Sequence, residues 1–281
     1  MKQNNQYIAP EFDSVRFAIP WSQSKQDIWT STFASLPMPE SGQILPRKAL
    51  FSFTYSAIAA VAIVMLLISF SWMYTKTAST PIASQMQIEL PDGSTVLMNA
   101  ETSVSYKPLW WIIQREVKLN GEAFFKVKKG KRFAVISKDA TTSVMGTSFN
   151  IYARHDGYEV TCMTGKVKVE PTTSEEVVVL TPNKKAVVAD DGHIVQHAVT
   201  AERSLAWSKN EFCFTSAELS KVFDEISRQY GVEIVWKGNF TDKYTGNFSK
   251  QMPIEQVLNL VCLPFAINFT AVNQNQYLIS K

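Results

Sequence analysis

The stretch VMGTSFNIY, residues 144–152, interrupts an apolar, β-prone run with the pair Gly146 and Thr147. A glycine at such a point can supply a bend, because it adopts positive φ more readily than other residues. A threonine hydroxyl directly after it can instead act as a nucleophile. These two residues alone do not distinguish the structural role from the chemical one.

Elsewhere, the residue types that usually do chemistry lack catalytic partners. The three histidines are His155, His193 and His197. None lies in a nucleophile, G-x-S-x-G or H-E-x-x-H motif. The carboxylate pairs at 175–176 and 190–191 lie in polar, turn-like contexts, which give no reason for a raised pKa. No glycine-rich phosphate loop is present, so the sequence predicts neither an ordinary enzyme active site nor a cofactor.

Cysteine spacing and net charge exclude further kinds of site. The three cysteines, Cys162, Cys213 and Cys262, show no metal-ligand spacing and cannot all pair with one another. We therefore expect free thiols and no metal. The formal net charge of +3 is too small to indicate nucleic acid as the main partner. The basic cluster KVKKGKR at 126–132 is expected to be a solvated hairpin tip rather than a phosphate site.

A membrane span is predicted at residues 49–75. No residue between Lys48 and Lys76 is charged, and about 20 apolar residues are enough to cross a bilayer. Tyr55, Trp72 and Tyr74 lie near the ends of this stretch, where aromatic rings favour the membrane interface. The stretch begins too far along the chain for an ordinary signal peptide. A buried core helix is the alternative.

The charges that flank the span predict its orientation. Arg47 and Lys48 precede it and only Lys76 follows it, so the positive-inside rule puts residues 1–48 in the cytoplasm. The rest of the chain would then lie in the periplasm of a bacterium with two membranes. The expected location is the inner membrane, single-pass, with a cytoplasmic N-terminus and a periplasmic C-terminus.

The N-terminal segment, residues 1–48, carries more aromatic side chains than so small a unit can bury. Residues 24–36 combine a Ser24 cap, Asp27 in the first turn and apolar residues at helical spacing. The aromatic residues therefore lie on the membrane surface or fold against a partner protein, and we favour the partner. The candidate contact residues are Trp21, Ile28, Trp29, Phe33 and Leu36.

Residues 76–205 are predicted to form an all-β domain, either a sandwich or a solenoid-like roll. Residues 86–99 contain two alternating runs joined at Pro91–Ser94, which is a strong hairpin signal. The run REVKLNGEAFFKV at 115–127 predicts a second hairpin around Asn120–Gly121. Short β-prone runs follow at regular intervals, and no window shows a sustained helical period.

Residues 206–281 change character and are predicted to form a small α+β module. The expected order is strand, helix, strand, strand, helix, strand, strand. Thr215-x-x-Glu218 has the pattern of a capping box, and the helix that it opens would end at Gly231. Pro253 is placed to open the second helix.

Eight blocks along residues 86–281 resemble, in order and spacing, the FecR family of membrane-anchored sigma-factor regulators. The blocks are LPDGSTVLMNAETSVSY, REVKLNGEAFFKVKK, RFAV, VMGTSFNIYA, VTCMTGKVKV, WSKNEFCFTSAELSKVFDEISRQYGVEI, TGNFS and PIEQVLNLV. The last three resemble the C-terminal module of Bacteroidetes-type members, which is similar to the small N-terminal domain of secretins and TonB-dependent transporters. A Pro-Gly-Glu-type turn common in the family is replaced here by residues 181–184, where Asn183 can still supply positive φ.

The resemblance implies a transmembrane anti-sigma factor. Its outer part would contact the N-terminal signalling domain of an outer-membrane TonB-dependent transporter, and its inner segment would bind an extracytoplasmic-function sigma factor. The lipid bilayer and periplasmic and intramembrane proteases are further implied partners, whereas no direct contact with nucleic acid is expected. The candidate transporter-binding residues are Phe212, Phe214, Tyr230 and Phe248.

The resemblance also gives the Gly146–Thr147 pair a specific chemistry. Some family members cleave themselves at a Gly-Thr bond, and this pair lies in the matching block. The Thr147 hydroxyl would attack the Gly146 carbonyl, and water would hydrolyse the ester formed by this N-to-O acyl shift. A simple bend remains the favoured explanation, and self-cleavage is a hypothesis beside it.

Two other classes of protein stay open. One is a membrane-anchored periplasmic glycan-binding or envelope scaffold protein, for which Trp110–Trp111 is the candidate aromatic platform. The other is a hydrolase, which the missing catalytic constellations weaken. Loss of transporter binding with retained glycan binding would favour the first of these.

Overall fold

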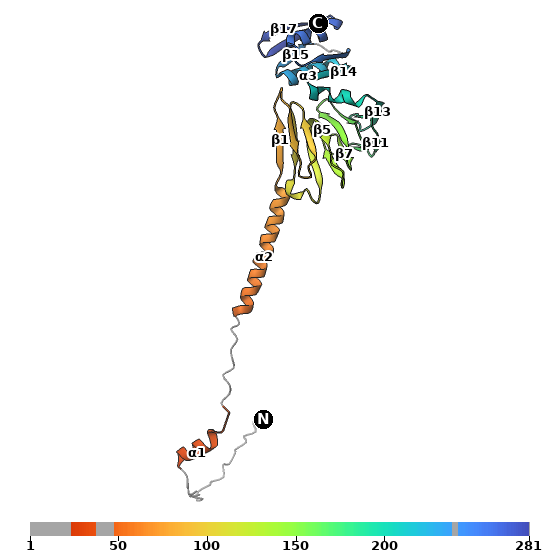
Figure 1. Ribbon diagram of the computed structural model, residues 1–281. Coiled ribbons are helices and arrows are strands. Elements are labelled where there is room, and N and C mark those ends of the chain that lie inside the picture. Colours follow the sequence, from red (N-terminus) through yellow and green to blue (C-terminus); the bar gives the residue numbers. More distant parts are fainter. Residues whose placement is uncertain (1–23, 38–47, 238–240, 281) are drawn as a thin grey trace, which may run out of the picture. The chain divides into compact units, whose positions relative to one another are not determined.

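The computed structural model describes residues 24–37, 48–237 and 241–280 (Figure 1). The chain divides into residues 1–61 and 62–281, and each unit is described by itself. In the first, helix α1 (Lys25–Phe33) begins at a capping box. The Asp27 amide donates to Ser24 Oγ over 3.3 Å, and the Ser24 amide donates to Asp27 Oδ2 over 3.2 Å. The expected cap is present because these bonds satisfy amides that the first helical turn leaves free.

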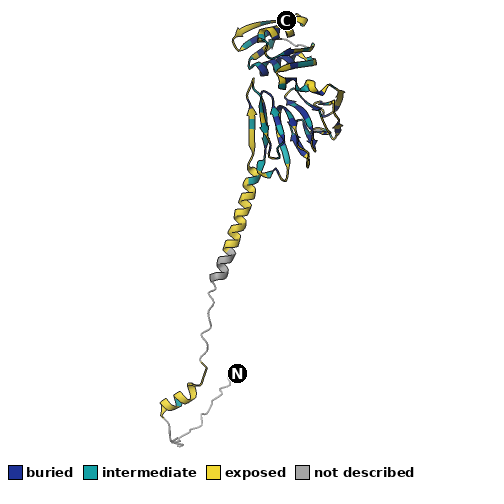
Figure 2. Ribbon diagram, viewed as in Figure 1, coloured by how far each residue is buried: buried dark blue, intermediate teal, exposed yellow. Residues whose placement is uncertain are grey.

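Helix α2 (Lys48–Met73) contains the long apolar segment. Its stretch Tyr55–Met73 is long and apolar enough to cross a membrane, and 0% of it is buried in the fold. Figure 2 shows almost all the described residues of this helix in the colour of exposed residues. The alternative of a buried core helix is therefore wrong, because a core helix would be covered by other elements. The chain has one candidate membrane span among its described residues.

A β-rich domain follows the span. Its strands are β1 (Lys76–Thr80), β2 (Met86–Glu89), β3 (Thr95–Met98), β4 (Thr102–Tyr106), β5 (Arg115–Lys126), β6 (Phe133–Ile136), β7 (Ala140–Val144), β8 (Ser148–Arg154), β9 (Gly157–Cys162), β10 (Val167–Pro171), β11 (Val178–Leu180), β12 (Lys184–Val188) and β13 (Ile194–Ala198). Two 3₁₀ helices accompany them, η1 (Pro108–Trp110) between β4 and β5, and η2 (Ala201–Lys209) after β13.

The strands form a folded-over sheet in which β5 belongs to both halves. Its first half pairs with β4 and β6, and its second half pairs with β3 and β8. The strand order is β11-β10-β7-β6-β5-β8-β9-β12-β13. Because β5 folds back, Arg115 at its start reaches residues just beyond its end, and Arg115 Nη2 donates to the Lys128 carbonyl over 3.1 Å. The result is a β sandwich whose two inner faces pack together.

Gly121 is the residue at which β5 passes from one half of the sandwich to the other. Its φ is +114°, and a Cβ there would lie 2.5 Å from Thr102 Oγ1 and 2.7 Å from Thr102 Cα. Only glycine fits this conformation and this close approach of another strand. The hairpin expected around Asn120–Gly121 is therefore wrong. The two halves pair with other strands rather than with each other, so the chain continues as one strand.

Two turns expected from the sequence are confirmed. Strands β2 and β3 pair with Glu89 opposite Thr95, and the Ser94 amide donates to Asp92 Oδ1 over 3.0 Å within the turn that joins them. Asn183 adopts a φ of +63° between β11 and β12. Both turns use a side chain that tolerates or stabilises a turn backbone.

One apolar core fills the sandwich, and it contains the aromatic residues Trp111, Phe125, Phe133 and Phe149. The rings of Phe125 and Phe149 stack with centroids 5.2 Å apart, and Trp111 meets Phe133 edge-on at 5.9 Å. Burial alternates along β3, β4 and β10, as it does in strands that cover a core with one face. The all-β domain that the sequence predicts is confirmed as a sandwich.

The C-terminal module has the expected order of elements. They are β14 (Glu211–Glu218), α3 (Leu219–Tyr230), β15 (Glu233–Lys237), β16 (Lys243–Ser249), α4 (Ile254–Cys262), the 3₁₀ helix η3 (Leu263–Phe265), β17 (Asn268–Asn273) and β18 (Gln276–Ser280). Strands β14 and β16 form a two-stranded sheet, and β15-β18-β17 form a three-stranded one. The apolar faces of α3 and α4 bury against both sheets, so the fold class of an anchored β domain with a small α+β module is confirmed.

Helix α3 starts later than its sequence pattern predicts. Thr215 does not cap it, because β14 continues to Glu218 through an irregularity between Phe214 and Ala217. Glu218 occupies the N-cap position without a side-chain cap bond. The far end follows the prediction, since Gly231 ends the helix with a φ of +71°.

Candidate interaction sites

Helix α1 presents an aromatic pair to solvent. The exposed fractions are 66% for Trp29, 47% for Phe33 and 59% for Leu36, and the Trp29 and Phe33 ring centroids lie 4.6 Å apart. Ile28 is partly covered, and Trp21 lies outside the described residues. Apolar side chains this exposed on a short helix are typical of a contact surface for a partner or a membrane.

Gly146 and Thr147 lie where the chain passes from one half of the sandwich to the other. Strand β7 pairs with β6 and β10, whereas the next strand, β8, pairs with β5 and β9. Gly146 has a φ of +148°, and a Cβ at this position would lie 2.6 Å from Lys129 Cα. The bend and the close backbone approach therefore account for the glycine without any chemistry.

The Thr147 hydroxyl is enclosed at this corner. Thr147 is 4% exposed, and its Oγ1 donates to the Lys166 carbonyl over 3.1 Å. A Cβ on Gly165 would lie 2.8 Å from the same Oγ1 and 3.3 Å from the Gly146 carbonyl oxygen. A carbonyl cannot take up the hydroxyl proton as a general base does. The backbone geometry accounts for the glycine at position 146, and self-cleavage at Thr147 stays a prediction.

The four candidate aromatic residues of the C-terminal module lie together. The Phe212 ring is tilted against that of Phe248, with centroids 4.7 Å apart, and it stacks on Tyr230 at 6.1 Å. Phe214 lies 5.9 Å from Phe248. Phe212 and Phe248 are buried, whereas Phe214 and Tyr230 are half-buried. The two buried rings belong to the core of the module and hold the β14–β16 sheet on it.

A groove of about 450 Å³ lies beside these two rings. Its lining comes from η2, β14 and β16, with Phe212 and Phe248 beside charged side chains. The charged lining residues are Glu202, Arg203, Lys209 and Glu211. An apolar floor with a charged rim is the usual composition of a protein contact site.

A buried polar cluster joins the β domain to the C-terminal module. Asn99 Nδ2 donates to Glu122 Oε2 over 2.8 Å, and Asn150 Nδ2 donates to Glu122 Oε1 over 2.9 Å. From helix α3, Gln229 Nε2 donates to Asn99 Oδ1 over 2.6 Å. Lys250 Nζ in turn donates to Gln229 Oε1 over 3.1 Å. Such a network fixes the mutual position of two surfaces because each buried polar group depends on its partner.

The Glu122 carboxyl has an unusual proton affinity. Burial, followed by repulsion from the Glu225 carboxylate, raises the pKa of Glu122 to about 7. Attraction to Arg154 and the two amide donors act in the opposite direction. Close to the carboxyl, Asn150 Oδ1 is buried without a hydrogen-bond partner, so a protonated Glu122 would gain an acceptor if that amide turned over.

Sequence reasoning missed Asn99, Glu122 and Gln229. Asn99 and Gln229 are 130 positions apart, and an isolated asparagine or glutamine carries no local signal of such a contact. The aromatic platform expected at Trp110–Trp111 is not formed, because Trp111 is buried and packs edge-on against Tyr106. The sequence does carry a signal for an exposed apolar surface here. Residues 108–113 form an apolar run that does not alternate as a half-buried strand does.

Within residues 24–37, 48–237 and 241–280, no group of three His, Cys, Asp or Glu side chains is arranged to hold a metal ion. The three cysteines are free thiols, and Cys162 and Cys262 are buried. Burial raises the pKa of both buried thiols to about 11. Neither thiol therefore has the lowered pKa of a nucleophile.

The fold and these surfaces define the class of the protein. Among the described residues, one apolar helix long enough to cross a membrane is followed by a β sandwich and an α+β module that offer contact surfaces. Family models agree, since "FecR protein" matches residues 76–168 and "FecR, C-terminal" matches residues 211–279. The chain belongs to the FecR family. Among curated proteins, none matches this sequence.

Two crystal structures of a "putative anti-sigma factor" from Parabacteroides distasonis ATCC 8503 are similar to this chain. The one at 2.50 Å resolution has 29% sequence identity and a TM-score of 0.69, covering 74% of this chain and 99% of that one. The one at 1.65 Å has 30% identity and a TM-score of 0.68, covering 73% and 99%. The similarity thus extends over nearly the whole length of those chains.

Proposed function

We propose that this protein is a transmembrane anti-sigma factor. It would relay a signal from an outer-membrane TonB-dependent transporter to an extracytoplasmic-function sigma factor in the cytoplasm. The observation that carries the proposal is the family membership, together with nearly full-length similarity to crystal structures described as an anti-sigma factor. The exposed aromatic pair on α1, which precedes the span, supports a separate partner for the N-terminal segment.

On the sigma side, Trp29, Phe33 and Leu36 would form the contact. Aromatic anchors give protein interfaces much of their affinity because they bury large areas with little loss of side-chain freedom. Trp21 and Ile28 are further candidates. Residues 1–48 would lie in the cytoplasm, as the positive-inside rule predicts.

On the transporter side, the C-terminal module would receive the signalling domain. The outer edge of β17 pairs with no strand among the described residues, and an unpaired edge can accept a strand from a partner. The groove beside Phe212 and Phe248 is a second contact point, where a partner side chain would meet the two rings. Binding there would be relayed along the chain through changes in contact or through proteolysis.

The full chain in detergent or nanodiscs, used to capture sigma factors of the host, tests the cytoplasmic half of this proposal. We expect specific capture of one sigma factor, reduced at least about tenfold when Trp29 and Phe33 are both replaced by alanine, because removing two anchor residues removes more than about 1.4 kcal/mol. Val272, exposed on β17, provides the matched control, and V272A should capture the sigma factor normally.

Two outcomes would contradict the proposal. The first is that no sigma factor is captured while α1 binds lipid vesicles, which would make the segment a membrane-surface anchor. The second is that capture is unchanged in the double variant, which would remove the aromatic pair from the contact.

A further inference from the structure

The loop between β4 and β5 lies next to the point where the chain leaves the membrane span. Helix α2 ends at Met73 and β1 begins at Lys76. Strand β1 pairs with β4 so that Lys76 lies opposite Tyr106, and the loop begins at the following residue. Lys107 Nζ also lies 4.5 Å from the centre of the Trp72 ring, near the end of the span. The loop is thus held at the membrane end of the β domain by the strand register itself.

This loop exposes three large aliphatic side chains. The exposed fractions are 55% for Leu109, 86% for Ile112 and 68% for Ile113. Trp111 between them is buried in the sandwich core, so the loop is anchored from within rather than loosely attached. The buried Trp111 side chain and the 3₁₀ helix η1 fix the backbone of the loop. The aliphatic side chains on either side of Trp111 are therefore held toward solvent.

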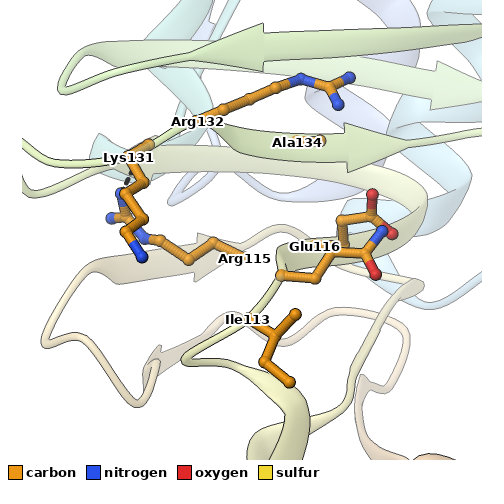
Figure 3. A pocket seen from close by; sticks show the side chains of 7 residues that line it. Ile113, Arg115, Glu116, Lys131, Arg132 and Ala134 are labelled. Carbon is orange, nitrogen blue, oxygen red and sulfur yellow. Dashed lines mark hydrogen bonds between the residues drawn. The ribbon is translucent and has the colours of Figure 1, made fainter.

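Cationic side chains lie beside Ile113. This residue lines a pocket of about 180 Å³ whose charged residues are Arg115, Lys131, Arg132 and the one acidic residue Glu116 (Figure 3). Arg115 donates from Nη1 to the Lys131 carbonyl over 2.7 Å, which ties the KVKKGKR turn to the start of β5. The exposed cations of this turn are Lys126, Lys128, Lys129, Lys131 and Arg132. None of these five forms a salt bridge with the described residues, whereas Arg115 is paired with Asp92.

We propose that Leu109, Ile112 and Ile113, with the 126–132 turn beside them, form a membrane-contacting surface that seats the β domain on the bilayer that α2 crosses. Aliphatic side chains next to lysine and arginine are the composition of interfacial membrane anchors. The aliphatic groups would enter the boundary between headgroups and acyl chains, and the cations would bind the phosphate groups of anionic lipids. The register of β1 with β4 places this surface within a few residues of the span, which favours the bilayer over any other occupant.

The consequence is a fixed orientation of the sandwich. A domain held only by Thr75 and its neighbours would rotate freely about its tether, whereas a second contact restricts that rotation. Gly146, which packs against Lys129, would then be held close to the membrane surface. The C-terminal module contacts the domain at its other end, around Asn99 and Glu122. Asn99 precedes β4 and Glu122 follows the first half of β5, whereas the membrane-contacting loop joins the end of β4 to the start of β5.

The test uses the full chain with C213S, because Cys213 is the one cysteine that is not buried. I112C in this background, labelled with an environment-sensitive fluorophore, is reconstituted in nanodiscs of phosphatidylcholine and phosphatidylglycerol. V179C, on β11, is the control, because Val179 is an aliphatic residue that is also exposed, at 54%. We expect blue-shifted emission at residue 112, quenching by nitroxide-labelled lipids, and several-fold protection from aqueous iodide relative to residue 179.

Iodide access at residue 112 equal to that at residue 179 would overturn the proposal, because a loop that is only tethered near the membrane stays in water. A second variant, K129E/K131E, tests the electrostatic part. It should reduce the protection of residue 112 in phosphatidylglycerol discs and leave it unchanged in pure phosphatidylcholine discs. An unchanged result in both would show that the turn is not in contact with anionic lipid. Self-association of the chain with loss of lipid quenching would identify a second copy as the occupant instead.

Discussion

At the level of single residues, Gly146 and Thr147 separate a structural role from a chemical one. The glycine is required by its φ of +148° and by the Lys129 backbone against which it packs. The threonine hydroxyl is hydrogen-bonded to the Lys166 carbonyl, and nothing in that contact activates it. Replacing each residue therefore tests a different claim.

For Gly146→Ala we expect a loss of stability of about 2–3 kcal/mol, because an alanine would be strained in this conformation and its Cβ would meet the Lys129 backbone. Urea unfolding of the full chain in detergent, followed by tryptophan fluorescence, measures it. Gly130→Ala is the matched control, since its Cβ would meet only the flexible Arg115 side chain at 3.1 Å. A loss of stability for Gly146→Ala as small as that for Gly130→Ala would show that the corner at Gly146 does not require glycine.

Self-cleavage is tested at Thr147. In the reaction, Thr147 Oγ bonds to the Gly146 carbonyl carbon, the peptide C–N bond breaks, and the freed amine takes up the hydroxyl proton before water hydrolyses the ester. If it occurs, the purified chain gives two fragments on a denaturing gel. Thr147→Ala should then give one intact band, and Thr147→Ser should retain cleavage. A single intact wild-type band from folded protein rejects the hypothesis.

The Glu122 carboxyl should make stability depend on pH. Its pKa is raised to about 7 in the fold, so the folded state binds the proton more tightly than the unfolded chain. The contribution is fully present below the unfolded pKa, near 4.3, and is lost as the pH rises to about 7, a decrease on the order of 1–3 kcal/mol. Glu122→Gln should remove this part of the pH dependence in urea unfolding between pH 4.5 and 8.

Glu175→Gln is the control for Glu122, because Glu175 is exposed. The informative quantity is the difference between each variant and the wild type at every pH, since other carboxyl groups also titrate in this range. A Glu122→Gln curve parallel to that of Glu175→Gln would mean that Glu122 stays ionised in the fold.

At the level of elements, β5 shows what a local pattern can and cannot predict. Alternating apolar residues and the Asp92–Gly93 turn predicted β2 and β3 correctly, because a two-residue signal closes a hairpin between neighbouring runs. Asn120–Gly121 has the same signal, yet the chain continues as one strand because Ser103 and other distant residues pair with it. Thr215 misled in the same way, since a partner strand extended β14 past the apparent helix cap. Periodicity reports local structure, and pairing between distant strands overrides it.

The bend in β5 should be sensitive to any side chain at Gly121. We expect Gly121→Ala to cost about 2–4 kcal/mol, because the φ of +114° is unfavourable and the Cβ would overlap the Thr102 backbone. Thermal unfolding of the full chain in detergent, read by circular dichroism in the β region, gives the loss. The double variant Gly121→Ala with Thr102→Gly should recover part of it, by removing the clashing side chain. No recovery, with a loss as small as that of Gly130→Ala, would show that the strand bends elsewhere.

At the level of the whole molecule, the proposed relay would require a signal at the C-terminal module to pass through the contact of this module with the β domain. The hydrogen bonds around Asn99 and Gln229 form part of that contact, together with the Ala83 amide, which donates to the Arg228 carbonyl over 2.8 Å. The sequence could predict the two folds that meet here, since each depends on its own pattern. It could not predict their contact, because isolated polar residues far apart in the chain form it.

Gln229→Ala should loosen this contact while leaving both folds intact. The change removes the donor to Asn99 and the acceptor of Lys250, and unpaired buried partners cost about 1–3 kcal/mol. Hydrogen exchange of the full chain in nanodiscs should become faster around Asn99 and at the end of α3, with the sandwich core unchanged. Gln256→Ala, at an exposed glutamine of α4, should exchange like the wild type. If Gln229→Ala does so too, this polar cluster does not hold the module on the domain, and a signal would have to cross by the remaining backbone contacts.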